Sequence, residues 1–467
     1  MKWRHLSLPP LSWLVVLLPL LGAFFYTPLA FGGVTPETVR VLDILLAASV
    51  VMWMVLLACQ RRMPSISRIC LAGIFVISVL GGAYLLNPLS VHREFDWKFI
   101  PLEGSIPWLP GSVDYAASFP VLLNLGALVL VGLVLQDAIS NSKTRWFLFR
   151  VVALSGFVIA IIGIIQKADG HESMLWVTPE RSGAVFFAAF RYHGNAASFL
   201  NLCWPAAFAV WIRSRTKDPT GMLASLDFCV LFFIAAAVFV NTSKAGHVLG
   251  LSGMVAMGWR FRSELRPRNV NKSVVIVTSL LLSLMLALVV LPAIFNSIAR
   301  WNSLATHGGS LSGRLSAYEA CLRALPETGF FGTGAGTFHL VFPEFSAYLG
   351  DRINGYWYHA HQDWLQGLME WGFVGFVAWA SLFLGAFVRL FRRIRQARME
   401  DQMEISDSVS LIALGVVLLH ALADFPLQIP AVQLLVVFYL AVAWGNTHRR
   451  GTHTPQKNPP MAGRELT

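Results

Sequence analysis

Two histidines and an aspartate precede a long apolar segment that begins at Trp364. Ionisable groups are costly to hold close to hydrocarbon, so those that occur there are functional candidates. His359, His361 and Asp363 alternate along this approach, and a histidine can accept or donate a proton near neutral pH. His361 is therefore a candidate to activate a sugar hydroxyl or to orient an acceptor, with His359 and Asp363 in support. The spacing also allows a structural role or metal binding; HxH alone is a loose metal pattern, and we predict no metal.

Three basic residues lie in polar stretches beside apolar segments. Lys244 lies between two such segments, and Arg191 leads a polar run that ends at Asn195. Arg314 is expected in the first turn of a helix for which Ser312 is the N-cap. A cation beside the free N–H groups of a helix N-terminus can bind an anion. The other interpretation is that the cations reach toward lipid headgroups and that Asn195 satisfies a helix end.

Together, these cations and His361 form a set that can bind a lipid-linked diphosphate and displace it with a hydroxyl. Arg191, Lys244 and Arg314 would neutralise charge on the departing diphosphate, while the imidazole assists the attacking oxygen. No metal or other cofactor is required if cations do this work. Asp363 and Glu370 remain available as acids, although no short motif holds the acidic pair of a glycoside hydrolase.

Two further patterns favour structural interpretations. Residues 332–338 form a glycine-rich run that resembles a phosphate-binding loop, but no predicted strand precedes it and no Lys-Ser pair closes it. We therefore predict that its glycines permit a tight turn. His420 and Asp424 are four residues apart in an apolar segment, which predicts that they share a helix face and pair with each other. The five cysteines show no CxxC spacing, so zinc is not expected.

The elements that must position these residues are membrane helices. The chain has 467 residues, of which 56% are hydrophobic and 13% charged, whereas soluble proteins have about 25% charged residues. Apolar runs of about 18 residues or more predict transmembrane helices. We expect an all-α integral membrane protein with about 12 such helices, near residues 11–33, 39–58, 68–87, 119–138, 147–166, 195–212, 222–241, 245–259, 273–295, 364–388, 408–424 and 429–446.

The net charge of +11 reflects topology rather than nucleic-acid binding. Arginines and lysines are concentrated in alternate loops, for example at 260–272 and 389–398, and this positive-inside bias places those loops in the cytoplasm. Both termini would then be cytoplasmic. The loops at 88–118 and 296–363 would lie outside, in the periplasm of a Gram-negative cell.

We expect one membrane domain, residues 1–446, followed by a disordered cytoplasmic tail, residues 447–467. Residues 296–363 form its large external loop. This loop contains too many aromatic residues for a disordered tether, and Leu315, Tyr318, Leu322 and Leu325 recur at helical spacing, which predicts a partly helical loop.

Several segments, taken in order, resemble the O-antigen ligase and polymerase superfamily. The resemblance covers roughly residues 150–445 and rests on segments 191–200, 243–246, 312–314, 328–338, 361–365, 370–372 and 420–427. Two positions depart from the family pattern. Lys244 stands where the family has arginine, which keeps the charge but loses the bidentate fork, and Gln362 stands where the family has asparagine.

The resemblance implies a GT-C-like, metal-independent, inverting membrane glycosyltransferase that uses an undecaprenyl-diphosphate-linked glycan. By position, it implies that Lys244 and Arg314 bind the diphosphate and that His361 activates the acceptor. The acceptor would be lipid A core or another glycan, at the periplasmic face of the bacterial inner membrane.

Other functions compete with this ligase interpretation. Within the family, the chain could be an O-antigen or exopolysaccharide polymerase, or a protein O-oligosaccharyltransferase. A polytopic transporter of lipid-linked glycans would also have many spans with internal charges, but transporters often show repeated halves, and no internal repeat is evident. A scaffold for envelope assembly would tolerate loss of the basic and histidine positions.

Overall fold

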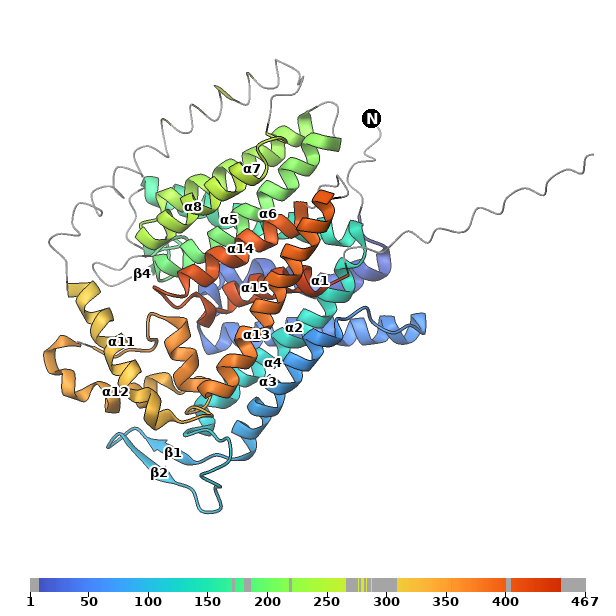
Figure 1. Cartoon of the computed structure of the whole chain (residues 1–467). Helices are drawn as coiled ribbons and strands as arrows, with labels where there is room; N and C mark the ends of the chain where they lie inside the picture. Colours follow the sequence, from blue (N-terminus) through green and yellow to red (C-terminus); the bar gives the residue numbers. More distant parts are fainter. Residues whose placement is uncertain are drawn as a thin grey trace, which may run out of the picture.

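The computed structural model describes residues 8–169, 173–179, 186–217, 221–265, 309–353, 355–399 and 405–446, with a few isolated positions between 276 and 287. This part of the chain is almost entirely helical (Figure 1). The helices of the main bundle are α1 (Leu11–Leu29), α2 (Pro36–Gln60), α3 (Arg68–Leu86), α4 (Tyr115–Ile139), α5 (Ser142–Asp169), α6 (His193–Lys217), α7 (Met222–Val240), α8 (Lys244–Arg260), α13 (Asp363–Met399), α14 (Ile405–His420) and α15 (Pro430–Trp444).

Eight helices among the described residues, α1 to α7 and α13, are long and apolar enough to cross a bilayer. The predicted architecture is confirmed in its coarse form: the described residues are nearly all-α, with several helices of membrane-spanning length and composition. Helices α8, α14 and α15 coincide with predicted spans but have only 17, 16 and 15 residues. The predicted span at 273–295 and the predicted tail at 447–467 lie outside the continuous described segments. The total of about 12 spans therefore stays a prediction.

Helix α6 is the central helix of the bundle. In its most apolar stretch 94% of the residues are buried, and it packs against α5, α7 and α14. Small residues permit this close packing: a Cβ added to Gly156 of α5 would lie 2.3 Å from the Cβ of Cys203 in α6. Membrane helices associate through such small residues because lipid supplies no hydrophobic driving force. The packing fixes the start of α6, where the polar run from Arg191 ends.

Helix α13 is broken at Gly372, whose φ is 60° and ψ −172°. The glycine-rich turn fills the break, because the N–H groups of Thr333 and Gly334 donate to the carbonyls of Met369 and Glu370 at 2.9 Å. A Cβ on Gly332 would lie 2.4 Å from the nitrogen of Gly372. The prediction that these glycines form a tight turn is confirmed. Their physical role is to let two backbones meet and satisfy each other.

A smaller group of elements gathers at one end of the bundle, at the lower left of Figure 1. It comprises α11 (Gly309–Thr328), α12 (Phe338–Ser346), the 3₁₀ helix η3 (Ala347–Arg352) and an antiparallel hairpin of β1 (Ser90–Arg93) and β2 (Lys98–Pro101). Phe338, Phe342 and Leu349 pack with Ala317 and Cys321 of α11 into a second hydrophobic core. The described part of the predicted external loop is thus ordered and helical, whereas residues 296–308 lie outside it.

One boundary prediction is wrong. Helix α11 begins at Gly309, so Ser312 lies inside the helix and is not its N-cap. Arg314 therefore projects from the second turn rather than the first. The predicted anion site, which combined this guanidinium with the free N–H groups of the helix start, is not formed as proposed, because those groups lie in the first turn.

Basic residues gather at the opposite end of the bundle. Arg62 pairs with Asp137 at 2.8 Å, and Arg393 pairs with Asp407 at 3.1 Å. The side-chain amide of Asn446, after α15, donates to the hydroxyl of Ser65, between α2 and α3, at 3.2 Å. These contacts link elements at the end of the bundle that the charge pattern assigns to the cytoplasm.

Candidate active site

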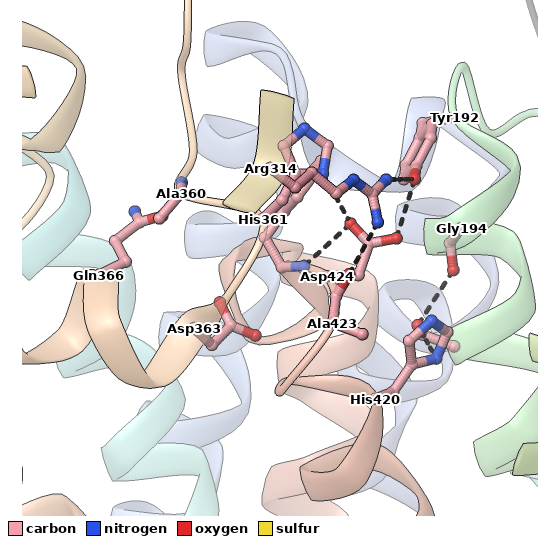
Figure 2. Close-up of polar contacts among 12 residues, drawn as sticks. Tyr192, Gly194, Arg314, Ala360, His361, Asp363, Gln366, His420, Ala423 and Asp424 are labelled. Atoms are coloured by element: carbon pink, nitrogen blue, oxygen red, sulfur yellow. Dashed lines mark hydrogen bonds and ion pairs between the residues drawn. The ribbon is translucent and has the colours of Figure 1, made fainter. Parts of the chain in front are cut away.

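His361 and Asp424 form a dyad between the start of α13 and the turn that follows α14. Nδ1 of His361 lies 3.1 Å from Oδ1 of Asp424 (Figure 2). The aspartate side chain is only 5% exposed and the imidazole 26%. The carboxylate accepts a hydrogen bond from the Nδ1–H group, which leaves the lone pair of the ring on Nε2. The pair is therefore arranged so that His361 can act as a general base.

The environment of Asp424 keeps it ionised. Burial alone raises the pKa of this carboxyl group, but the hydrogen bond from His361 and the nearby charges of His420 and Arg314 outweigh it, so that the pKa is below its usual value. An ionised partner stabilises an imidazolium that forms during reaction.

Arg314 joins the dyad through a tyrosine. Its Nη2 donates to the hydroxyl of Tyr192 at 3.0 Å, and that hydroxyl donates to Oδ2 of Asp424 at 2.9 Å (Figure 2). Nη1 of Arg314 donates to the carbonyl of Ala423 at 2.9 Å. The Tyr192 ring stacks on Phe425 with centroids 5.6 Å apart. The guanidinium is thus fixed two hydrogen bonds from the carboxylate that holds His361.

The backbone of His361 is held in an unusual conformation. Its φ is 51°, in the left-handed region that residues other than glycine seldom adopt. The hydroxyl of Tyr318 in α11 donates to its carbonyl at 2.7 Å. Gln362 then caps α13, because its side-chain oxygen accepts the N–H of Leu365 at 2.5 Å. Gln362, one of the two departures from the resemblance, therefore acts as a helix cap.

His359 forms a wall of the site rather than a second base. Its ring stacks on Phe425 with centroids 4.4 Å apart. Burial, followed by the charge of His361, lowers the pKa of His359 to about 4, so this imidazole is neutral at physiological pH.

Asp363 and Glu370 position the surrounding elements. The carboxylate of Asp363 accepts the Leu427 N–H at 2.8 Å and the Gln428 amide at 3.1 Å, which anchors the segment after Asp424 to α13. Glu370 accepts the N–H of Phe338 at 3.2 Å and so caps α12. Both predicted acids lie close to His361 in the sequence, but their carboxylate oxygens accept hydrogen bonds from neighbouring segments and so hold the fold together.

The other predicted residues lie at or near the starts of α6 and α8. Asn195 is buried near the start of α6, and its N–H donates to the carbonyl of Tyr192 at 3.1 Å. Arg191 places its guanidinium 5.0 Å from the centre of the Phe31 ring. Lys244 is the first residue of α8, where the helix dipole disfavours a cation.

The start of α8 is tied to the segment that carries Tyr192. The amide of Asn241 donates to the carbonyl of His193 at 3.0 Å. Ser243 caps α8 by accepting the Gly246 N–H at 3.2 Å. The structure thus brings Arg314 and His361 into one network and places Lys244 at a helix start bonded to the neighbouring segment.

Sequence reasoning missed two partners in this network. It paired His420 with Asp424, but His420 Nδ1 hydrogen-bonds to Ser198 at 2.9 Å, and Asp424 bonds to His361 and Tyr192 instead (Figure 2). The predicted pairing is wrong because the helix ends at His420 and turns the aspartate toward α13. Asp424 could have been recognised as a functional candidate because it is an acidic residue among apolar ones. No comparable signal marks Tyr192, which lies between two basic residues.

A cleft of about 360 Å³ opens at His361. It is lined by Tyr356, Trp357, Tyr358, His359, His361 and Phe425. A separate apolar cavity of about 210 Å³ lies between α3, α4, α13 and α15, with Asp363 and Glu370 in its lining. The remaining lining of this second cavity is mostly apolar and suits a hydrocarbon chain, whereas the cleft contains His361 of the dyad. We therefore place the chemistry in the cleft.

No group of three or more His, Cys, Asp or Glu side chains with the geometry of a metal site occurs among the residues for which the structure is described.

Comparison with known proteins finds a family model that matches part of the chain. A family model described as O-antigen ligase matches residues 229–380, which agrees with the resemblance found in the sequence. The matched region contains Lys244, Arg314 and His361 and ends before Asp424. None of the curated proteins matches the chain.

Proposed function

We propose that this protein is a membrane glycosyltransferase of the O-antigen ligase type. It transfers a glycan from undecaprenyl diphosphate to an acceptor hydroxyl on lipid A core or another glycan. The observation that carries the proposal is the His361–Asp424 dyad, linked to Arg314 through Tyr192; His361 and Arg314 lie in the segment that the family model matches.

The reaction follows from this arrangement. Nε2 of His361 accepts the proton of the acceptor hydroxyl while its oxygen attacks the anomeric carbon of the donor sugar. The bond from that carbon to the diphosphate oxygen breaks on the opposite face, so the configuration inverts. Arg314 and Lys244 stabilise the negative charge on the departing undecaprenyl diphosphate. Asp424 stabilises the imidazolium, and the scheme uses no metal.

The proposed location is the bacterial inner membrane, with both termini in the cytoplasm and the dyad at the periplasmic face. The gathering of basic residues at the opposite end of the bundle supports this orientation. A glycan transporter is less well supported, because transporter sites lie near the bilayer midplane. Here the dyad is built from residues at the ends of α13 and α14.

The test uses a gene deletion complemented with single variants. His361→Ala should accumulate in the membrane normally, while transfer falls at least about 100-fold, the lower end for loss of a general base. Arg314→Ala should also lose transfer. Arg323→Ala is its matched control, because Arg323 lies on the same helix, is exposed and pairs with Glu319 and the Tyr348 ring rather than with the dyad network. Transfer by His361→Ala at the wild-type rate would refute the proposal.

The glycan that accumulates in the deletion strain distinguishes a ligase from a polymerase and from a protein oligosaccharyltransferase. Long glycans left on the carrier lipid in the deletion strain indicate a ligase, and single repeats on the final acceptor indicate a polymerase. An unglycosylated envelope protein indicates a protein oligosaccharyltransferase. An unchanged glycan profile would refute all three.

A further inference from the structure

Five aromatic rings form a continuous group beside the cleft. We define the aromatic platform as His92, Trp97, His339, Tyr356 and Tyr358. His92 and Trp97 of the hairpin have centroids 4.6 Å apart, and Trp97 meets Tyr356 at 5.8 Å. Tyr356 meets Tyr358 at 4.8 Å, and Tyr358 stacks on His339 of α12 at 5.3 Å. Three separate segments thus contribute to one group.

The aromatic platform reaches the dyad directly. Tyr356 and Tyr358 line the same cleft as His361. Trp357, between them, contacts the His361 ring edge-on, with centroids 5.4 Å apart. A ligand seated on these two tyrosines therefore lies next to the catalytic imidazole.

The three largest rings of the aromatic platform are exposed. Tyr358 is 63% exposed, Tyr356 46% and Trp97 40%. Aromatic side chains dominate the energetics of cores and interfaces because of their large apolar area. A contiguous exposed group of them marks a binding surface rather than ordinary packing.

The hairpin turn holds Trp97 in a strained conformation. Its φ is 54°, which is an outlier for a bulky residue. An ion pair between Arg93 and Asp96 braces the same turn. Residues kept in such conformations cluster at ligand-binding sites, where the surrounding structure maintains them.

The chemistry of the aromatic platform suits a sugar. The face of an aromatic ring carries partial negative charge and attracts the C–H groups on one face of a pyranose. Tyrosine hydroxyls donate and accept hydrogen bonds, as sugar hydroxyls require. Burial lowers the pKa of His339, and a hydrogen bond to the Gly336 backbone occupies one of its ring nitrogens, so the neutral ring offers its other nitrogen as an acceptor. The cleft volume of about 360 Å³ lies in the lower range for small-ligand sites.

We propose that the aromatic platform binds the sugar residues of the acceptor glycan next to the hydroxyl that attacks. This inference rests on the proposed glycosyl transfer. Arg314 instead contacts Tyr192 and Ala423, where it is available to the diphosphate of the donor. The two substrates would thus meet at His361 from different sets of residues.

The test measures binding separately from transfer. The probe is water-soluble core oligosaccharide, released by mild acid from the lipopolysaccharide of the source cells. It is added to the full-length protein in nanodiscs, and saturation-transfer NMR gives Kd. Trp97→Ala and Tyr358→Ala should each weaken binding about three- to tenfold, as loss of one aromatic contact predicts. Trp97→Phe should retain most of the affinity.

Trp108→Ala is the matched control, because Trp108 is 76% exposed on the same external loop but is not part of the aromatic platform. It should leave Kd unchanged. In the transfer assay, Trp97→Ala should raise the KM for acceptor by the same factor as Kd and leave kcat within about twofold. Equal unfolding temperatures of all variants would exclude misfolding as the cause.

The outcomes separate the two proposals. If the wild-type protein binds the glycan in a Trp97-dependent way but has no transferase activity, the proposed function is refuted and the assignment of the aromatic platform as a sugar-binding site stands. Unchanged Kd and KM in Trp97→Ala and Tyr358→Ala would refute the platform, whatever His361→Ala does. If these variants instead only weaken insertion into nanodiscs, the rings are interfacial membrane anchors and the sugar assignment is wrong.

Discussion

Replacement of Asp424 by asparagine tests how the dyad works. The substitution keeps the size of the side chain but removes its charge and one acceptor oxygen. In the wild-type protein the two oxygens face His361 Nδ1 at 3.1 Å and the Tyr192 hydroxyl at 2.9 Å. Asparagine offers one oxygen and one NH₂ group, so it cannot accept from both. Where the NH₂ group faces the imidazole, the ring proton moves to Nε2 and the base is lost.

The magnitude follows from the lost charge. Opposite unit charges about 4 Å apart interact by about 4 kcal/mol at an effective dielectric constant of about 20. This value suits Asp424, whose side chain is 5% exposed. Each 1.36 kcal/mol in the barrier is about tenfold in rate, so the upper limit is about a 10³-fold loss. We expect kcat to fall about 10²- to 10³-fold, with little change in the KM for donor.

The assay is transfer from purified lipid-linked glycan to acceptor, measured with protein reconstituted in nanodiscs. Asp43→Asn is the matched control, since it makes the same substitution in α2, at an acid that accepts from Asn124. Its kcat should stay near that of the wild type. If a correctly folded Asp424→Asn protein retains kcat within about threefold, Asp424 does not support the base and the argument from the dyad fails.

Three further predictions concern binding, packing and pH. Lys244→Arg should retain or improve transfer and Lys244→Ala should lose it; equal rates in all three proteins would rule out a phosphate contact there. Gly372→Ala should lower the unfolding temperature in detergent, because an added Cβ meets the Phe330 carbonyl at 2.3 Å. Gly82→Ala, where a Cβ meets nothing within 4 Å, should not. The free energy of unfolding should fall as pH drops from about 6.5 toward 4, because unfolded His359 binds a proton that the folded ring, with its pKa of about 4, does not. His359→Phe should reduce that loss in denaturant titrations at pH 7 and pH 5; an unchanged loss would contradict the assignment.

The helices of the bundle could be predicted from the sequence because their main signal is local. A run of apolar residues as long as the bilayer is thick specifies a spanning helix without knowledge of its neighbours. The start of α11 was misplaced because Ser312 is a good cap residue by composition, whereas the helix extends back to Gly309. Helix ends depend on contacts that no single residue type encodes.

The candidate site was only partly predictable for a related reason. His361 and Arg314 were visible as polar residues in a resemblance to a known family. Their link through Tyr192 depends on how α6, α11 and the turn after α14 meet, and this is a property of tertiary packing. The glycine-rich turn was recognised, but its partner, the break in α13 at Gly372, lies 40 residues away from Gly332.

The same packing explains why the dyad geometry should be sensitive to changes outside it. His361 and Asp424 are 63 residues apart in the chain, so their contact persists only while α13 and the turn after α14 stay in register. Asp363 maintains that register by bonding the Leu427 N–H, and the Asp363 N–H in turn donates to the Ala421 carbonyl at 2.9 Å. A small misplacement of a catalytic group can cost about 10²-fold in rate. In the proposed reaction, we therefore expect Asp363 to position the dyad without contacting either substrate.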